Sequence, residues 1–251
     1  LGTVTAAEFS EIEGQVEPQM VVDACLARAR ELGAKLVEGT SVTAFTRSKG
    51  SRRIENLETS AGSLPCDVVV LAAGVSTTEL AAKAGVHVPQ EESPGVVIRT
   101  DPRPPLLPTV PVVYAPPLDP EHSEIHLRQC HDGSFMIGEG NQESLRRDDS
   151  QDHAEDLLGR AIHYLPSLAG ARAITVPVGY RPMPLDGYPV LGFPAQGSPA
   201  SGSGEAAPNV YIALTHSGVT LAPLIGEVAA IEIVDGVRVE GLAPYRPERF
   251  L

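Results

Sequence analysis

The spacing of apolar and polar residues predicts four helices. Between Pro18 and Leu32 apolar residues recur every three or four positions; Pro18 suits the first helical turn and Gly33 the stop. The same period predicts three more helices, at 76–85, at about 151–165 and at about 219–234.

Short runs rich in β-branched residues predict the strands. The run at 67–72 is continuously apolar and ends at Ala73 and Gly74, which is typical of a strand buried on both faces of a parallel sheet. A small meander is expected before it, with strands at 35–38, 41–47 and 54–59. Later strands are expected at 95–100, 110–115, 125–130, 134–138, 171–180, 188–193 and 209–214. The turn His131-Asp132-Gly133 predicts that the strands on either side of it form a hairpin.

This order of elements predicts an α/β fold with α+β character, in three parts. Residues 1–85 and 194–251 are expected to share one layer that contains the parallel sheet. Between them, residues 86–193 carry clusters of proline that separate short strands, which predicts an inserted antiparallel domain. The segment 194–208 is of low complexity and is expected to be a loop.

Composition and charge narrow the possible partners. The 251 residues carry a formal net charge of −13, which repels phosphate backbones and anionic lipid surfaces, so we expect neither nucleic acid nor membrane as a partner. The three cysteines are odd in number and lack metal-ligand spacing, so we expect a reducing compartment, the cytoplasm. His122 and His126 lie on a predicted strand, where residues four apart do not converge, and no metal site is expected.

Five motifs follow one another along the chain. They are E-G-Q-V-E-P from Glu13, G-T-S-V from Gly39, V-V-L-A-A-G ending at Gly74, G-Y-R-P-M-P-L-D-G-Y-P-V-L-G from Gly179, and A-L-T-H-S-G-V-T-L-A-P from Ala213. In this order they resemble the motifs of D-amino-acid-oxidase-like flavoproteins, from about Glu11 to Gly236. The resemblance implies a Rossmann-like FAD-binding portion (1–85 and 194–251) and an inserted substrate-binding domain (86–193).

The same resemblance implies the chemistry. The protein would be an FAD-dependent oxidase or dehydrogenase that removes a hydride from the carbon next to the amine of an amino acid or N-alkyl amino acid. Such a transfer needs alignment and an electron sink more than a protein acid or base. No cysteine lies within the Arg181 motif, so the FAD is expected to be bound non-covalently.

Two groups of residues are the main candidates for the site. Arg181 can grip a substrate carboxylate in a bidentate way that a lysine cannot match, although a salt bridge is the alternative interpretation. The turn before the last helix presents free N–H groups and a positive dipole end, which suits a flavin carbonyl; an ordinary strand-to-helix turn is the alternative. The residues expected to line the flavin ring are His216, Ser217, Gly218, Val219 and Thr220.

Two further contacts are implied by the resemblance. Ala72, Ala73 and Gly74 would lie against the ribityl or phosphate region, and the backbone of Val42 would pair with adenine. Helix–strand packing at a tight turn is the alternative for the first group, and a plain strand valine is the alternative for Val42.

The phosphate-binding segment of such flavoproteins is a strand, a G-x-G-x-x-G turn and a helix. The best formal match here starts at Gly202, follows no predicted strand and opens no predicted helix, so it is expected to be a flexible loop. We therefore expect a second, N-terminal polypeptide to hold the FAD phosphates, either as a nicked fragment or as a separate subunit, and this chain to be inactive alone. The alternative is a non-catalytic scaffold subunit of a flavoprotein complex. An NAD-dependent dehydrogenase is disfavoured because no fingerprint for that cofactor is present.

Overall fold

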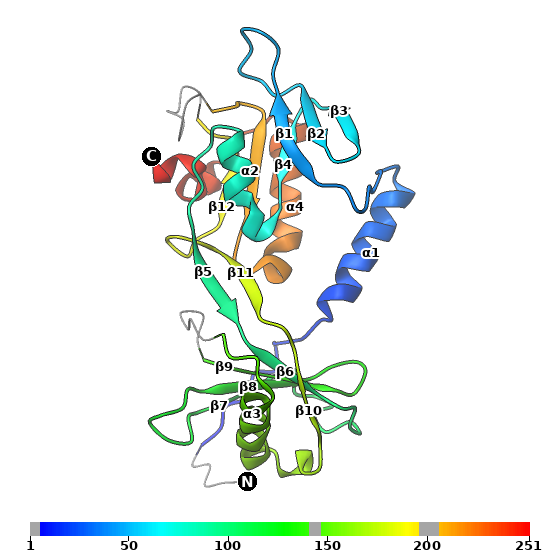
Figure 1. Cartoon of the computed structure of the whole chain (residues 1–251), viewed down its shortest axis with the longest axis vertical. Coiled ribbons are helices and arrows are strands. Elements are labelled where there is room, and N and C mark those ends of the chain that lie inside the picture. Colours follow the sequence, from blue (N-terminus) through cyan, green and yellow to red (C-terminus); the bar gives the residue numbers. More distant parts are fainter. Residues whose placement is uncertain (1–5, 141–146, 196–205) are drawn as a thin grey trace. The chain divides into compact units, whose positions relative to one another are not determined.

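The computed structural model describes residues 6–140, 147–195 and 206–251 (Figure 1). They form two compact units, one of residues 1–34 and 93–180, the other of residues 35–92 and 181–251. The unit boundaries fall within β5 (Gln90–Gly95) and β11 (Gly179–Pro184), which are hydrogen-bonded to each other as a two-stranded ladder. The functional domain boundaries expected from the sequence stay a prediction.

The first unit is built on a five-stranded antiparallel sheet. Its strand order is β10-β6-β9-β8-β7, and helix α3 (Gln151–Tyr164) packs against β8, β9 and β10 (Figure 1). Alternate residues of the central strands point into one apolar core together with one face of α3, as the period of two in strands requires. The five strands are β6 (Val97–Thr100), β7 (Val113–Ala115), β8 (Ile125–Gln129), β9 (Phe135–Glu139) and β10 (Ala173–Thr175).

Local signals explain where these elements begin and turn. The Ser150 side chain accepts a hydrogen bond from the His153 N–H and so caps α3. Gly133 has a φ of +83°, which a residue with a side chain rarely adopts, and it closes the β8–β9 hairpin. The predicted hairpin is confirmed. A short 3₁₀ turn, η2 (Pro166–Leu168), follows α3.

Helix α1 (Pro18–Glu31) confirms the first predicted helix, but none of its residues is buried. The segment before it is tied to the β8–β9 hairpin of the same unit. Gln15 Nε2 donates to the Gln129 carbonyl at 3.0 Å, and the His131 N–H donates to Glu17 Oε1 at 3.1 Å.

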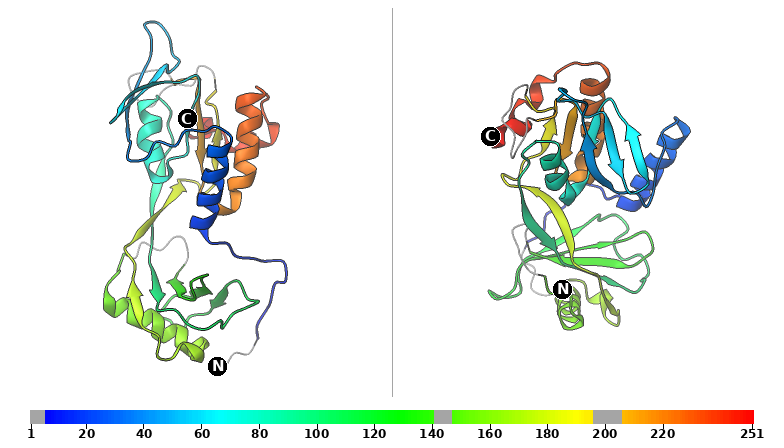
Figure 2. Two further views of the ribbon diagram at one scale, coloured as in Figure 1. Left: turned by 90° about the vertical axis from the view of Figure 1, so that its right-hand side faces the viewer. Right: turned by 45° about the horizontal axis from the view of Figure 1, so that its top comes forward.

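The second unit contains a three-stranded sheet and a separate meander. In the sheet, β13 (Val210–Leu214) is central; β4 (Val69–Leu71) runs parallel to it and β12 (Val190–Gly192) antiparallel. The meander β1-β2-β3 can be followed in the right-hand view of Figure 2. Its strands are β1 (Val42–Thr46), β2 (Asn56–Thr59) and β3 (Gly62–Pro65). The helical elements of this unit are η1 (Gly74–Ser76), α2 (Thr77–Lys83), α4 (Gly218–Val234), η3 (Glu240–Tyr245) and η4 (Pro247–Phe250).

Asn209 joins the meander to the sheet. Its Oδ1 accepts from the Ile54 N–H at 2.9 Å, and its Nδ2 donates to the carbonyls of Ile54 at 2.8 Å and Asp67 at 2.9 Å. The Asn209 residue is 1% exposed, so these bonds lie out of water. One side chain thus fixes the residues that precede β2, β4 and β13.

Two sequence-based expectations about this unit are wrong. The meander does not use 35–38, which lie outside any strand; its third strand is β3, because Gly62, with a φ of +122°, allows a tight reversal after Thr59. The run at 67–72 is not buried on both faces: Val69 and Leu71 lie in the core, but Val70 is 47% exposed.

The predicted fold class is confirmed. A parallel strand pair, antiparallel sheets and helices together make an α/β fold with α+β character. The glycine-containing segment at 202–205 lies outside the described residues. Among the described helices, none is both long and apolar enough to cross a membrane.

Candidate functional site

The parallel strands β4 and β13 bring two of the predicted segments to one edge of the sheet. Leu71 is paired with Ile212, so the residues that follow each strand lie at the same end. Ligands of open α/β sheets bind at the carboxyl ends of parallel strands. Ala72 to Gly74 and the turn after Leu214 therefore lie where a ligand of this sheet is expected.

The first segment offers bare backbone at this edge. Ala72 and Ala73 are exposed although they follow a strand whose ends are buried. Gly74 has a φ of +57° and begins η1, and a side chain there would meet open space, so its conformation requires glycine and packing does not. Small residues at an open strand end allow a ligand to approach the main chain closely.

The second segment is the N-terminus of α4. Its first helical hydrogen bond runs from the Leu221 N–H to the Ser217 carbonyl at 2.9 Å, so the N–H groups of Gly218, Val219 and Thr220 precede the ladder. Ser217 makes no side-chain capping bond to them, and all three residues are exposed. The helix end is therefore a set of free donors with a positive dipole, suited to an electron-rich oxygen.

Arg181 and His216 lie on the same side of this unit. Burial lowers the pKa of the His216 imidazole below 6.5, and the nearby positive charge of Arg181 lowers it further. The His216 Nδ1 lies 3.2 Å from Ser217 Oγ. The structure thus brings together the guanidinium expected to bind substrate and the loop expected to face the flavin.

Val42 is the one predicted contact that belongs to the meander. It begins β1 and pairs with Thr59, with a bulge between Val42 and Ala44. Its link to the sheet runs through Asn209, since that side chain bonds Ile54 just before β2. The roles assigned to Val42 and to the other site residues stay predictions.

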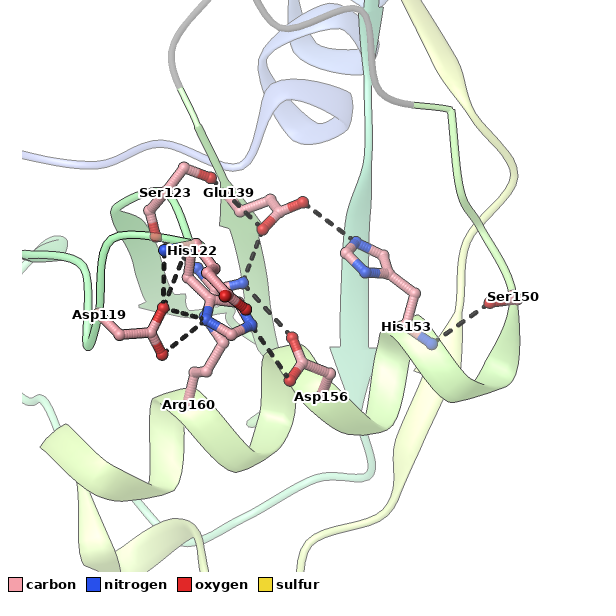
Figure 3. Close-up of polar contacts among 9 residues, drawn as sticks. Asp119, His122, Ser123, Glu139, Ser150, His153, Asp156 and Arg160 are labelled. Atoms are coloured by element: carbon pink, nitrogen blue, oxygen red, sulfur yellow. Dashed lines mark hydrogen bonds and ion pairs between the residues drawn. The ribbon is translucent and has the colours of Figure 1, made fainter.

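A second polar cluster lies in the first unit, between α3 and the sheet (Figure 3). The Glu139 carboxylate, at the end of β9, is buried and is 2.6 Å from Arg160 Nη1 and 3.3 Å from His153 Nε2. Since both of these nitrogen-bearing side chains come from α3, the cluster attaches this helix to the end of the central strand.

The same cluster extends to the loop before β8. His122 Nδ1 lies 2.8 Å from Asp119 Oδ1, and Asp156 Oδ2 lies 3.5 Å from Arg160 Nη1 (Figure 3). The bond to His122 lowers the pKa of the Asp119 carboxyl. Across the described residues, no group of three or more His, Cys, Asp or Glu side chains is arranged to hold a metal ion. We interpret the cluster as structural.

Sequence reasoning missed the partner of Asp186. This residue belongs to the same motif as Arg181, and its carboxylate is bound by Arg249, 63 residues further along the chain. No local pattern signals a pair at that separation. The pair nevertheless lies next to the candidate substrate arginine in the sequence, because only five peptide units separate Asp186 from Arg181.

Comparisons with known proteins agree with the geometry. Residues 2–231 match the family model DAO, described as FAD dependent oxidoreductase. One of the subunits of opine oxidase from Agrobacterium tumefaciens is 26% identical over 72% of this chain and 43% of that protein. Hydrogen cyanide synthase subunit HcnC of Pseudomonas aeruginosa is 30% identical over 70% of this chain and 40% of that protein. The chain thus spans less than half the length of these relatives.

Solved structures show the same fold. L-proline dehydrogenase from P. horikoshii superposes with a TM-score of 0.71 at 23% identity, over 93% of this chain and 59% of that chain. Glycine oxidase from Geobacillus kaustophilus gives a TM-score of 0.71 at 24% identity, over 92% of this chain and 58% of that chain.

Proposed function

Because the chain belongs to the family of FAD dependent oxidoreductases, we propose that it supplies the substrate-binding and flavin-ring-facing part of an amine or amino-acid oxidoreductase. The reaction removes a hydride from the carbon next to the amine of an amino acid or N-alkyl amino acid. One observation carries the proposal: Arg181 lies close enough to His216, beside the free N-terminus of α4, to shift the pKa of its imidazole.

The residues at this edge of the sheet fit FAD. The N–H groups that precede the α4 ladder can donate to an electron-rich ring oxygen, and the exposed backbone at Ala72 and Ala73 leaves room for a cofactor to lie against the main chain. The residues that would hold the ring and its attached chain are Ala72, Ala73, Gly74, His216, Ser217, Gly218, Val219 and Thr220, with Val42 at the adenine. Bound FAD would accept the hydride.

The chain's own residues bind and orient the substrate. Arg181 offers two parallel N–H donors to a carboxylate, which fixes the direction of the neighbouring carbon. The lowered pKa keeps the His216 imidazole largely neutral at neutral pH, so it adds no positive charge beside the substrate amine. Since His216 Nδ1 lies near Ser217 Oγ, Nε2 is the ring atom left to face a substrate.

Substitution of Arg181 in the assembled flavoprotein tests this proposal. Substrate is added under anaerobic conditions and bleaching of the flavin absorbance is followed. Arg181→Ala should slow bleaching by about two orders of magnitude or more, and Arg181→Lys should restore it only partly because its donors do not form a fork. Arg238→Ala, which removes an exposed arginine of the same unit, is the matched control. Unchanged bleaching with Arg181→Ala would instead favour a non-catalytic scaffold subunit.

We also propose that a second polypeptide, which binds the FAD phosphates, covers α4 and the open face of β4. This helix is apolar along most of its length, yet its only buried residue is Glu232, while Leu224 is 58% and Val234 79% exposed. The partner would be an N-terminal nicked fragment or a separate subunit. Two relatives are themselves described as subunits, which supports a multi-chain enzyme. The cytoplasmic location stays a prediction.

The partner proposal has its own test. Leu224→Glu should leave the isolated chain as stable as wild type, because the side chain is exposed, but should prevent co-purification of a second polypeptide and FAD. Leu64→Glu, an exposed leucine on β3, is the control that should still assemble. Assembly of the Leu224 variant with full flavin content would show that no partner covers this face.

A further inference from the structure

The C-terminal segment, defined here as residues 235–251, is bound to the turn between β11 and β12. Arg249 Nε lies 2.6 Å from Asp186 Oδ2 and Arg249 Nη2 lies 2.9 Å from Asp186 Oδ1, so the contact is bidentate. The same guanidinium donates to the Tyr188 carbonyl at 2.9 Å and to the Tyr245 carbonyl at 2.9 Å. The Arg249 side chain is only 17% exposed. This differs from an ordinary surface ion pair, which is flexible and screened by water.

The Asp186 carboxylate also organises its own turn. It accepts the Tyr188 N–H at 3.1 Å, and the Gly187 N–H donates to the Pro184 carbonyl at 2.8 Å. Gly187 has a φ of +76°, so the reversal requires glycine. The bond to Arg249 is the main cause of the lowered pKa of the Asp186 carboxyl.

The chain between this turn and Arg181 has little freedom to absorb movement. Pro182 and Pro184 each fix one backbone dihedral, and Met183 between them is buried. The run R-P-M-P-L-D therefore behaves as a stiff connection of five peptide units between the candidate substrate arginine and Asp186. A shift of the turn moves Arg181 with it.

A second arginine of the C-terminal segment holds the other end of β12. Arg246 is buried and makes a bidentate pair with Glu232 of α4, with Nη1 2.7 Å from Oε2, and donates to the Val239 carbonyl at 3.0 Å. A Cβ on Gly192, the last residue of β12, would overlap Arg246 Nη1. The guanidinium therefore occupies the space that a side chain at Gly192 would need.

Strand β12 connects both arginines to the loop that precedes α4. Val190 of β12 is paired with Leu214, and His216 follows two residues later. The C-terminal segment thus contacts β12 at both ends, the turn that leads back to Arg181, and the far end of the helix that starts at Gly218. Residues 232–251 lie beyond the stretch matched by the family model.

We propose that Arg249 and Arg246 are positioning residues, which hold Arg181 and the His216 loop at the separation that the substrate requires. The inference rests on the proposed function, because it assigns the C-terminal segment to the same site. Neither arginine acts on the substrate directly.

Arg249→Ala in the assembled flavoprotein tests the proposal, with Arg249→Lys as the conservative variant. Arg238→Ala is the matched control, since Arg238 belongs to the same segment but forms only an exposed pair with Glu248. Arg246 is left intact, because loss of a buried charge pair can unfold the protein. Hydrogen exchange is measured on peptides covering 179–184 and 185–189, and propionate, a carboxylate without an amine, is titrated while the flavin absorbance is recorded.

Faster exchange in both peptides is expected for Arg249→Ala, together with a propionate dissociation constant raised about tenfold or more, partial rescue by Arg249→Lys, and no change with Arg238→Ala. Unchanged exchange in 179–184 overturns the proposal, and so does faster exchange with unchanged propionate affinity. Failure of the proposed function looks different: the wild-type flavin spectrum, or its propionate dependence, would then be insensitive to Arg181→Ala.

Discussion

Replacement of Asn209 by leucine should loosen the meander from the sheet. The side chain makes three hydrogen bonds to backbone groups on two other segments, and leucine has a similar volume but cannot replace any of them. The N–H and carbonyl of Ile54, itself a core residue, would be left unpaired and buried. An unpaired buried group costs about 1–3 kcal/mol, so the loss from Ile54 alone is about 2–6 kcal/mol. The third acceptor, the exposed Asp67, can be rehydrated and adds little.

The free energy of unfolding is measured by urea denaturation of the isolated chain. Asn209→Leu should lower it by about 3 kcal/mol, near the middle of that range. Thr43→Ala is the matched control, because Thr43 also bonds a backbone carbonyl of the meander but at an exposed position, and it should cost under about 1 kcal/mol. A loss below about 1 kcal/mol for Asn209→Leu would refute the reasoning, since the meander would then be held by other contacts.

Three further predictions follow from contacts of single residues. Gly192→Ala should destabilise the chain by at least about 3 kcal/mol in urea denaturation, because its Cβ would collide with Arg246 at a φ of +110°; a wild-type midpoint would contradict this. Arg160→Met should cost about 3–5 kcal/mol by leaving Glu139 buried without its closest cation, and adding Glu139→Gln should recover part of the loss. Burial lowers the pKa of His216, so the unfolded chain takes up a proton that the folded chain does not; stability should fall as pH drops below about 6.5, and His216→Asn should flatten this dependence.

Helices and hydrogen-bonded turns were predictable because their signals are local. The period at 151–165 and the capping serine before it locate α3, and the His131-Asp132-Gly133 turn locates the β8–β9 hairpin. The meander was harder. Residues 35–38 have β-forming side chains but no partner strand, whereas 62–65, with a glycine and a proline, become β3 because the reversal after Thr59 sets them beside β2.

The candidate site was only partly predictable for the same reason. Motif spacing located Arg181, Gly74 and the turn before α4, since each belongs to a run of local signals. Asn209 and Arg249 carry no such signal. Their partners are 155 and 63 residues away, and only the register of β13 with β4 and the path of the C-terminal segment bring them together.

The burial of α4 is the reverse of what a lone globular chain requires. A helix that is apolar all round is normally enclosed by protein. Here the buried residue is the charged Glu232, neutralised by Arg246, whereas Val219 and Leu224 face outward. Burial of a paired charge holds the inner side of α4 against the chain's own C-terminal segment, and burial of the apolar side would require a second surface. The free N–H groups at Gly218 would then be fixed from both sides, which is why we expect the site to become rigid only in the assembly.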